Sequence, residues 1–367
     1  MKRRHLLSFL SFLSFMLSSA VFAQTEVSEF RPGATLEGVN YFLPKTVFRV
    51  VVEAEKATTI PGEFATYADR YLRLKDVPTL RQDTWTLKSV TLLPYGVPDS
   101  TKAFSIKVKS KTSAPLVSLT DDGLLLAINT EAEAEPEPNM PKPVPAGKPV
   151  NGREFMTKEI LAAASTSKMA QLTAEEIYDI RESLNALLRG EADNTPKDGA
   201  QLKLMLDGLT EQAYALETLF KGQTLTSTEV FQFDFDPSAM FNSNDEAKNM
   251  EARTILCRFS QRLGLVEGDD LSGEPLWINI RMLGNLPSSV EDADVQRRQA
   301  KMDKGVWVNQ PARAQVTVAN ASATLAQMEA SLSQFGTLEV LSAALFDKKP
   351  ETRVTFYQHT GSVKRLE

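Results

Sequence analysis

Residues Leu172–Gly222, LTAEEIYDIRESLNALLRGEADNTPKDGAQLKLMLDGLTEQAYALETLFKG, decide the fold, because their local signals agree on two consecutive helices. Thr173 and Glu176 have the spacing of a capping box, in which side chains bond the free N–H groups at a helix start. Gly190 is a typical residue just past a helix end. The apolar residues in between recur at helical spacing: Ile177, Ile180, Leu184, Leu187 and Leu188. The first helix is therefore expected to begin after Thr173 and to end at Gly190.

The second helix follows after a short connection. Thr195 is its expected N-cap, with Pro196 at the first helical position, where the missing N–H is not needed. Gly222 is expected to end it. Its apolar stripe is Leu202, Met205, Leu206, Leu209, Ala213, Leu216 and Phe220. The short connection predicts an antiparallel pair whose two stripes form a core rather than a cofactor groove.

Strand-like sequence lies on both sides of this hairpin. Runs of β-branched and aromatic residues predict these strands: Val39–Leu43, Thr46–Glu55, Thr84–Leu93, Ala103–Lys109, Leu116–Leu119, Leu124–Ile128, Glu229–Asp236, Pro275–Met282, Gly305–Asn309, Ala314–Val318, Thr337–Leu341, Thr352–Gln358 and Ser362–Leu366. Further helices are expected at Glu63–Leu74, Thr157–Ala164 and Ala252–Leu265, and Ser288–Asp303 is expected to be a loop or exposed helix. The predicted fold class is α+β, with two β-rich lobes flanking a central helical hairpin.

A proline-rich segment separates the first β-rich part from the hairpin. It is Glu131–Gly152, EAEAEPEPNMPKPVPAGKPVNG, and such a sequence cannot form a core and favours an extended polyproline conformation. A spacer is the favoured interpretation, and a proline-rich ligand for another domain is the alternative. The predicted division is a signal peptide at 1–23, an N-terminal β-rich domain at 24–130, a linker at 131–152, the helical hairpin at 153–222 and a C-terminal β-rich domain at 223–367.

The two β-rich parts share a local pattern that suggests a distant duplication. Tyr67–Tyr71 and Phe259–Leu263 each contain an arginine, and a tryptophan follows fifteen residues after it, at Trp85 and Trp277. Both segments are expected to be helices that follow a strand, and both tryptophans to open a strand. Chance similarity of strand–helix–strand units is the alternative.

The N-terminus has the pattern of a secretory signal peptide. Lys2, Arg3 and Arg4 form a basic start, and Leu6–Leu17 is an apolar run too short to span a bilayer. The small residues before Gln24 predict cleavage after Ala23, and a retained N-terminal anchor is the alternative. The expected location is the periplasm or the medium.

Composition limits the possible chemistry. The chain has 367 residues and a net charge of −6, which becomes more negative when the basic signal is removed. This charge argues against binding to nucleic acid, and no further apolar run predicts membrane insertion. Cys257 is the only cysteine, so no intramolecular disulfide can form. It is expected to be a small core residue rather than a nucleophile.

Several long motifs carry a family resemblance. They are EILAAASTSKMAQLTAEEIYDIRESLNALLRG, TPKDGAQLKLML, YFLPKT, PGEFATYADRYLRLKDV and GLVEGDDLSG. With these motifs the chain resembles a family of secreted proteins from Bacteroidetes known only as a domain of unknown function. The resemblance covers nearly the whole mature chain. It implies a Gram-negative envelope setting and implies no reaction or catalytic residue.

Few residue types suited to catalysis remain in the mature chain. His359 is its only histidine, so a serine or cysteine triad would have to use it, and a solvated turn residue is the favoured interpretation. One histidine and one cysteine make an ordinary zinc site improbable. A glycosidase needs only two suitably spaced carboxylates, and the sequence cannot select such a pair.

Oxygen ligands and tryptophans supply two weaker candidate sites. Asp234, Asp236, Asn242, Asn244, Asp245 and Glu246 could bind Ca²⁺, although their spacing is not that of an EF-hand and a polar loop is favoured. Glu267, Asp269 and Asp270 form a second acidic turn for which a polar loop is likewise favoured. Trp85, Trp277 and Trp307 could stack on sugars, but core burial is favoured for Trp85 and Trp277.

The sequence therefore favours an exported, non-catalytic binding or scaffold module of the Gram-negative cell envelope, whose partner is an unknown envelope protein or glycan. The alternative is a periplasmic carbohydrate-active hydrolase that uses paired carboxylates. A module stabilised by calcium is a third, weaker hypothesis. No catalytic, cofactor-binding or metal-binding residue is assigned.

Overall fold

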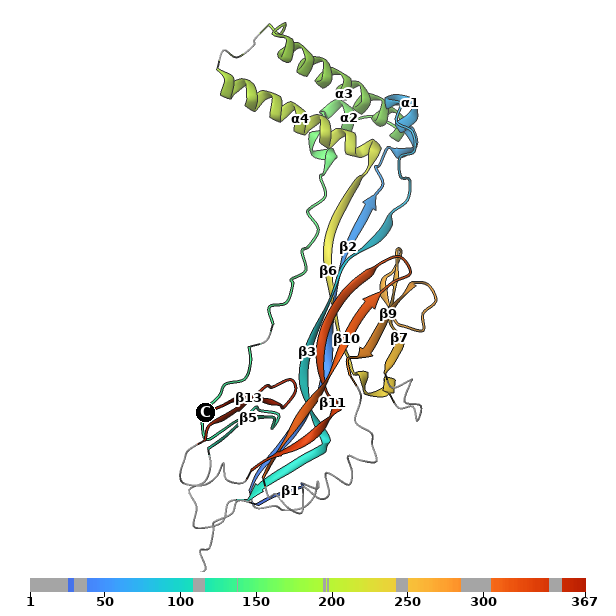
Figure 1. The fold of residues 1–367 in the computed structure, drawn as a ribbon. Helices are drawn as coiled ribbons and strands as arrows, with labels where there is room; N and C mark the ends of the chain where they lie inside the picture. Colours follow the sequence, from blue (N-terminus) through green and yellow to red (C-terminus); the bar gives the residue numbers. More distant parts are fainter. Residues whose placement is uncertain are drawn as a thin grey trace, which may run out of the picture.

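The computed structural model is an elongated molecule that is richer in strand than in helix (Figure 1). The structure describes residues 26–29, 38–107, 116–136, 138–193, 196, 198–241, 250–284, 305–342 and 352–367. The signal segment 1–23 and the predicted loop Ser288–Asp303 lie outside these ranges. None of the described helices is long and apolar enough to cross a membrane.

The two long helices of the hairpin are confirmed, as α3 (Thr166–Arg189) and α4 (Gly199–Lys221). Both predicted glycine ends are confirmed too, since Gly190 and Gly222 have positive φ angles of 72° and 71°. Figure 1 shows the hairpin at one end of the molecule.

The predicted helix starts are wrong. The first helix begins earlier, with Ser165 as N-cap, and Thr173 is buried inside it. The Thr173 hydroxyl bonds the carbonyl oxygen of Met169 at 2.8 Å, so the helix continues past a residue that could have capped it. The second helix begins later than predicted, with Asp198 in place of Thr195 as N-cap.

Shorter helices cover the base of the hairpin. The predicted helices at Glu63–Leu74 and Thr157–Ala164 are confirmed in shorter form, as the 3₁₀ turn η1 (Ala65–Tyr67) with α1 (Ala68–Leu72), and as α2 (Lys158–Leu161). The 3₁₀ turn η2 (Gly152–Phe155) precedes α2. Their apolar residues and the stripes of α3 and α4 form one cluster, in which the rings of Phe64 and Phe220 lie 5.4 Å apart.

Sheet A is built on one long hairpin. Its strand order is β1-β3-β2-β6, with β1 at Glu26–Glu29, β2 at Val39–Ile60, β3 at Gln82–Lys107 and β6 at Gln223–Phe235. β2 and β3 were each expected as two shorter strands. Each is continuous, because the register shifts at Pro44 and the ladder resumes beyond this proline. β2 has 22 residues and therefore spans about 70 Å.

Sheet C packs against the middle of sheet A. Its strand order is β11-β10-β9-β7-β8, with β7 at Glu251–Ser260, β8 at Gly264–Val266, β9 at Glu274–Met282, β10 at Val306–Ala319 and β11 at Thr324–Leu341. The first part of β11 was missed from the sequence. Apolar side chains from the facing sides of sheets A and C form the largest cluster, which includes Phe48, Val50, Ile278 and Val316.

The predicted helix Ala252–Leu265 is wrong, because this stretch forms β7, a turn and β8. The ladder between β7 and β9 shifts register between Ile255 and Cys257. This bulge interrupts the two-residue alternation of buried side chains, so the apolar spacing resembles that of a helix. The suggested correspondence with Tyr67–Tyr71 therefore pairs a helix with a strand and turn, whereas Trp85 and Trp277 both lie in strands. Descent of the two flanks from one duplicated unit stays a prediction.

Sheet B pairs strands near the C-terminus with strands that precede the proline-rich segment. Its strand order is β13-β12-β5-β4, with β4 at Val117–Leu119, β5 at Leu125–Ile128, β12 at Val354–Phe356 and β13 at Val363–Leu366. A third cluster beneath it contains Tyr41 of β2 and Trp307 of β10. Sheets A and B thus each combine strands from before and after the helical hairpin.

Candidate functional site

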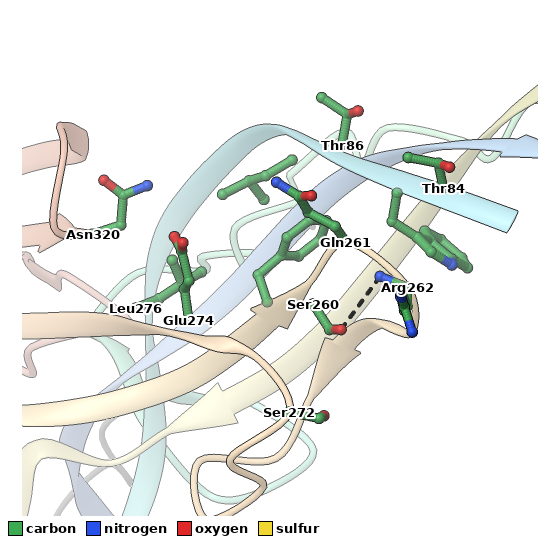
Figure 2. A pocket seen from close by; sticks show the side chains of 12 residues that line it. Thr84, Thr86, Ser260, Gln261, Arg262, Ser272, Glu274, Leu276 and Asn320 are labelled. Atoms are coloured by element: carbon green, nitrogen blue, oxygen red, sulfur yellow. Dashed lines mark hydrogen bonds between the residues drawn. The ribbon is translucent and has the colours of Figure 1, made fainter.

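A polar groove with a volume of about 600 Å³ lies between sheets A and C. We call it the Trp85 groove. Four of its lining residues are apolar or aromatic: Trp85, Leu87, Phe259 and Leu276. The other eight, labelled in Figure 2, are polar or charged: Thr84, Thr86, Ser260, Gln261, Arg262, Ser272, Glu274 and Asn320. The groove therefore combines apolar side chains with many hydrogen-bonding groups.

Backbone bonds hold the two walls of the groove together. The Trp85 N–H donates to the carbonyl oxygen of Gln261 at 2.8 Å, which joins β3 to the turn between β7 and β8. Gly264 lies against the indole and has a φ of +79°. A Cβ at this position would come within 3.0 Å of the Trp85 ring. The glycine is thus needed both for the turn and for seating the tryptophan.

The turn that carries Gln261 and Arg262 is fixed by a buried serine. Ser260 Oγ accepts hydrogen bonds from the backbone N–H groups of Arg262 at 3.3 Å and Leu263 at 3.4 Å (Figure 2). The side chains of Gln261 and Arg262 are exposed. Their amide and guanidinium groups are free to bind a ligand from a rigid backbone.

The opposite rim is held by Arg258. Its guanidinium donates to the carbonyl oxygens of Gly268 at 2.8 Å and Gly273 at 3.1 Å, which ties down the loop between β8 and β9. Within this loop the backbone N–H of Ser272 donates to Asp270 and lowers the pKa of its carboxyl group. The predicted acidic turn is therefore an ordered loop beside the groove.

The tryptophans do not form open stacking platforms. Trp307 is buried and its ring stacks on Phe104 at 5.6 Å. Trp85 and Trp277 are half-buried, and each ring carries a cation: Lys56 Nζ lies 5.3 Å from the Trp85 centroid, and the Arg253 guanidinium lies 4.3 Å from that of Trp277. Trp85 supports the groove wall and offers only part of its ring to a ligand.

His359 lies in the turn before β13, so its predicted place in a turn is confirmed, but its side chain is half-buried and only partly solvated. Its ring meets that of Tyr357 edge-on at 5.8 Å, and burial lowers its pKa. Its carbonyl oxygen accepts from Thr46 Oγ1 at 3.1 Å, which ties the turn to β2. The role shown for this residue is a structural contact.

Cys257 is a core residue, as predicted. It is buried in β7, and burial raises the pKa of its thiol to about 12. A thiol that stays protonated in this way is a poor nucleophile.

The described part of the predicted calcium cluster is neutralised by cations. Asp234 pairs with Arg49 at 3.2 Å, and Asp236 pairs with Lys45 at 2.6 Å. Burial opposes ionisation of Asp236, but hydrogen bonds from Lys45 and Ser238 outweigh it and lower the pKa of the carboxyl group. The other predicted ligands, Asn242, Asn244, Asp245 and Glu246, lie outside the described residues. Within the described ranges no three metal-binding side chains gather.

Sequence reasoning missed the Trp85 groove because four separate segments build it and one of them was expected to be helical. Gly264, Gly268 and Gly273 were the available signal, since closely spaced glycines favour turns between short strands.

Comparison with known families and proteins gives one match. A family model described as "Domain of unknown function (DUF4831)" matches residues 37–364. No curated protein and no solved structure matches the chain.

Proposed function

We propose that this chain, which belongs to the family of unknown function DUF4831, is an exported, non-catalytic binding module of the Gram-negative cell envelope. The Trp85 groove is the proposed binding site. The observation that carries the proposal is its lining, in which many hydrogen-bonding side chains stand beside apolar ones and Glu274 is the one carboxylate.

The groove chemistry favours a neutral ligand rich in hydroxyl groups. Gln261 and Asn320 carry amides, Thr84 and Ser272 carry hydroxyls, and Arg262 is an exposed cation. Such groups donate to and accept from sugar hydroxyls, while the half-buried side chains of Trp85 and Leu87 supply apolar surface for the face of a sugar ring. Of the two partner classes considered, an envelope glycan therefore fits the groove better than a protein surface.

The alternative of a carbohydrate-active hydrolase finds less support. Both retaining and inverting enzymes need two carboxyl groups, roughly 5 to 9.5 Å apart across the scissile bond. Glu274 is the one carboxylate among the twelve groove residues. The groove can thus hold a glycan, but its lining lacks the acid pair that would cleave one.

Export rests on the pattern of the first 23 residues, whose basic start and apolar run are typical of a cleaved signal peptide. Fractionation of cells that express the full chain, followed by N-terminal sequencing of the product, tests this step. A mature chain that begins at Gln24 and is released by osmotic shock is expected. A cytoplasmic chain that begins at Met1 would refute export.

The binding step is tested by calorimetry on the mature chain, using fragments of peptidoglycan, outer-membrane glycans and common polysaccharides as probes. Arg262→Ala should weaken binding of any ligand that is found by at least about tenfold, since a hydrogen bond to a charged group contributes roughly 1.5 to 3 kcal/mol. Gln261→Ala should weaken it less, by about two- to tenfold, since a bond between neutral groups contributes roughly 0.5 to 1.5 kcal/mol.

Arg253→Ala is the matched control, because Arg253 is exposed on β7 and stacks on Trp277 outside the groove. It should leave binding unchanged. The same incubations, followed by product analysis, test for hydrolysis. Release of shorter sugars would overturn the non-catalytic assignment, and equal losses in Arg262→Ala and Arg253→Ala would overturn the site.

A further inference from the structure

Strand β6 forms one border of sheet A and pairs in full only with β2. The ladder between β2 and β6 is antiparallel and runs without a register shift from Phe48–Phe235 to Ile60–Gln223. Within an antiparallel ladder, alternate residues direct both backbone groups to the same side. In every second residue of β6, the backbone N–H and C=O groups therefore point away from β2.

The outward residues are identified by one contact. Thr228 N–H donates to the carbonyl oxygen of Val144 at 2.8 Å, and Val144 N–H donates back to Thr228 at 2.9 Å. Residues with the same parity as Thr228, namely Thr226, Val230 and Gln232, face the same way. No backbone partner among the described residues meets the outward N–H and C=O groups of these three.

The segment that provides Val144 is the proline-rich linker, which runs beside the sheet from sheet B to the helical hairpin (Figure 1). We call its residues 131–150 the strap. The strap makes few contacts with the edge of β6. One is the backbone bridge between Val144 and Thr228, and Val144 is 59% exposed. The other is at Gln223, whose side-chain amide accepts from the N–H of Val150 and donates to its carbonyl oxygen. At the other end of the strap the N–H of Glu135 donates to Gln358 at 2.8 Å.

The proline content explains why the strap pairs so little. Pro143 and Pro145 flank Val144 and hold φ near −65°, which favours a polyproline helix with three residues per turn. A strand alternates every two residues. Because one conformation repeats every three residues and the other every two, backbone groups of the strap align with those of β6 at Val144 but not at the neighbouring positions. The strap therefore covers the edge of β6 without forming a continuous ladder.

We propose that the outer edge of β6 is a docking site for an extended segment of a partner protein, which replaces the strap and adds antiparallel to β6 as a fifth strand of sheet A. This mode of recognition uses backbone hydrogen bonds for affinity and alternate side chains for specificity. The strap shows that an extended chain fits the edge in this direction. The proposal goes beyond glycan binding and does not depend on the Trp85 groove.

The faces of β6 define the chemistry of the partner segment. Phe231, Phe233 and Phe235 lie half-buried on the side that packs toward sheet C, while Thr226 and Gln232 are exposed on the other side. A matching strand therefore alternates apolar and polar residues and contains no proline. Its apolar side chains would extend the row formed by the three phenylalanines.

The test uses fluorescein-labelled peptides and the mature chain. The first peptide copies residues 139–150, and in the second Pro141, Pro143, Pro145 and Pro149 are replaced by threonine, which allows a strand conformation. In the register of Val144 opposite Thr228 these four positions lie on the side of the phenylalanines, so threonine tests the backbone pairing without adding apolar contacts. The threonine peptide is expected to bind at least about tenfold more tightly in fluorescence anisotropy, because it can add two or more hydrogen bonds. Equal binding of the two peptides, or none, would overturn the proposal.

N-methylation of the threonine peptide supplies matched controls. With Val144 opposite Thr228, the N–H groups at positions 142 and 146 face β6, and those at 143 and 145 face solvent. Methylation at 142 and 146 should abolish binding, whereas methylation at 143 and 145 should preserve it. The same loss from both pairs would overturn the proposed register.

A disulfide lock tests the location. Val144 and Thr228 form a hydrogen-bonded antiparallel pair, with Cα atoms about 5.5 Å apart, which suits a disulfide. In the double variant Val144→Cys, Thr228→Cys, oxidation should abolish peptide binding, and reduction should restore it. Cys257 is buried and should not interfere. Binding that is unaffected by oxidation would place the peptide elsewhere and refute the proposal. Arg262→Ala separates the two sites, since it should weaken glycan binding and leave peptide binding unchanged.

Discussion

Replacement of Asn309 by alanine should destabilise the junction of the three sheets. Asn309 lies in β10 and is fully buried. Its side-chain amide donates to the carbonyl oxygens of Pro44 at 2.9 Å and Thr360 at 2.8 Å, and so connects β10 to β2 and to the turn before β13. These bonds join segments that are far apart in the sequence.

The magnitude follows from what each carbonyl group loses. The Pro44 carbonyl oxygen keeps a second donor, because Ser333 Oγ bonds it at 2.9 Å, whereas no other donor among the described residues bonds the carbonyl oxygen of Thr360. An unsatisfied buried acceptor costs about 1 to 3 kcal/mol, and the lost second bond to Pro44 adds about 1 kcal/mol. These losses add to about 2 to 4 kcal/mol, and removal of the buried Asn309 Oδ1, which has no hydrogen-bond partner among the described residues, offsets about 1 kcal/mol of them. We expect Asn309→Ala to lower the free energy of unfolding by about 1 to 3 kcal/mol.

Urea denaturation of the mature chain, followed by circular dichroism, measures this change. Gln310→Ala is the matched control, because the neighbouring Gln310 side chain bonds Glu339 at the surface. The control should lie within about 0.5 kcal/mol of the wild type. If Asn309→Ala were as stable as Gln310→Ala, the buried amide could not be what connects the sheets.

Two further changes test other parts of the fold. Glu217 accepts from Arg181 at 2.8 Å and Lys221 at 2.9 Å; burial opposes its ionisation, but these cations lower its pKa. The ionised Glu217 therefore contributes stability that is present above its unfolded pKa and is lost as the pH falls through its lower folded pKa. Glu217→Gln should lower the free energy of unfolding by about 1 kcal/mol at pH 7. In urea titrations at several pH values, the variant should also lose less stability than the wild type below about pH 4.5. Gly264→Ala should destabilise by about 2 kcal/mol through positive φ and contact with Trp85, and should shift tryptophan emission; an unchanged spectrum and midpoint would contradict the seating of the indole.

The helical hairpin was predictable because its determinants are local. The apolar stripes and the glycines at positions 190 and 222 lie within the helices they define. The helix starts were harder to predict, because several residues near each start belong to types that can cap a helix. For α3 both Ser165 and Thr173 are of such a type, and the burial of Thr173 inside the helix leaves Ser165 as the N-cap. For α4 the N-cap is Asp198.

The sheets were predictable as strands but not as sheets. Local sequence shows that residues near Val354 form a strand, yet nothing local shows that this strand pairs with β5, over 200 residues earlier. The pairing of β6 with β2 is non-local in the same way. Prediction of the Trp85 groove would require two pieces of non-local information: that residues 251–260 form the strand β7, and that the turn after β7 lies against β3.

Strand β2 runs through two of the three apolar clusters and leads into the third. β2 contributes Tyr41 and Leu43 to the cluster under sheet B, and Phe48 and Val52 to the cluster between sheets A and C. It then leads directly to Phe64 in the helical cluster. A shift of β2 by one residue would turn its buried side chains toward solvent in the first two clusters at once. A register shift of β2 is therefore opposed by burial in both clusters at once. A partner strand on β6 would add to the sheet that β2 and β3 form, and β3 also supplies one wall of the Trp85 groove.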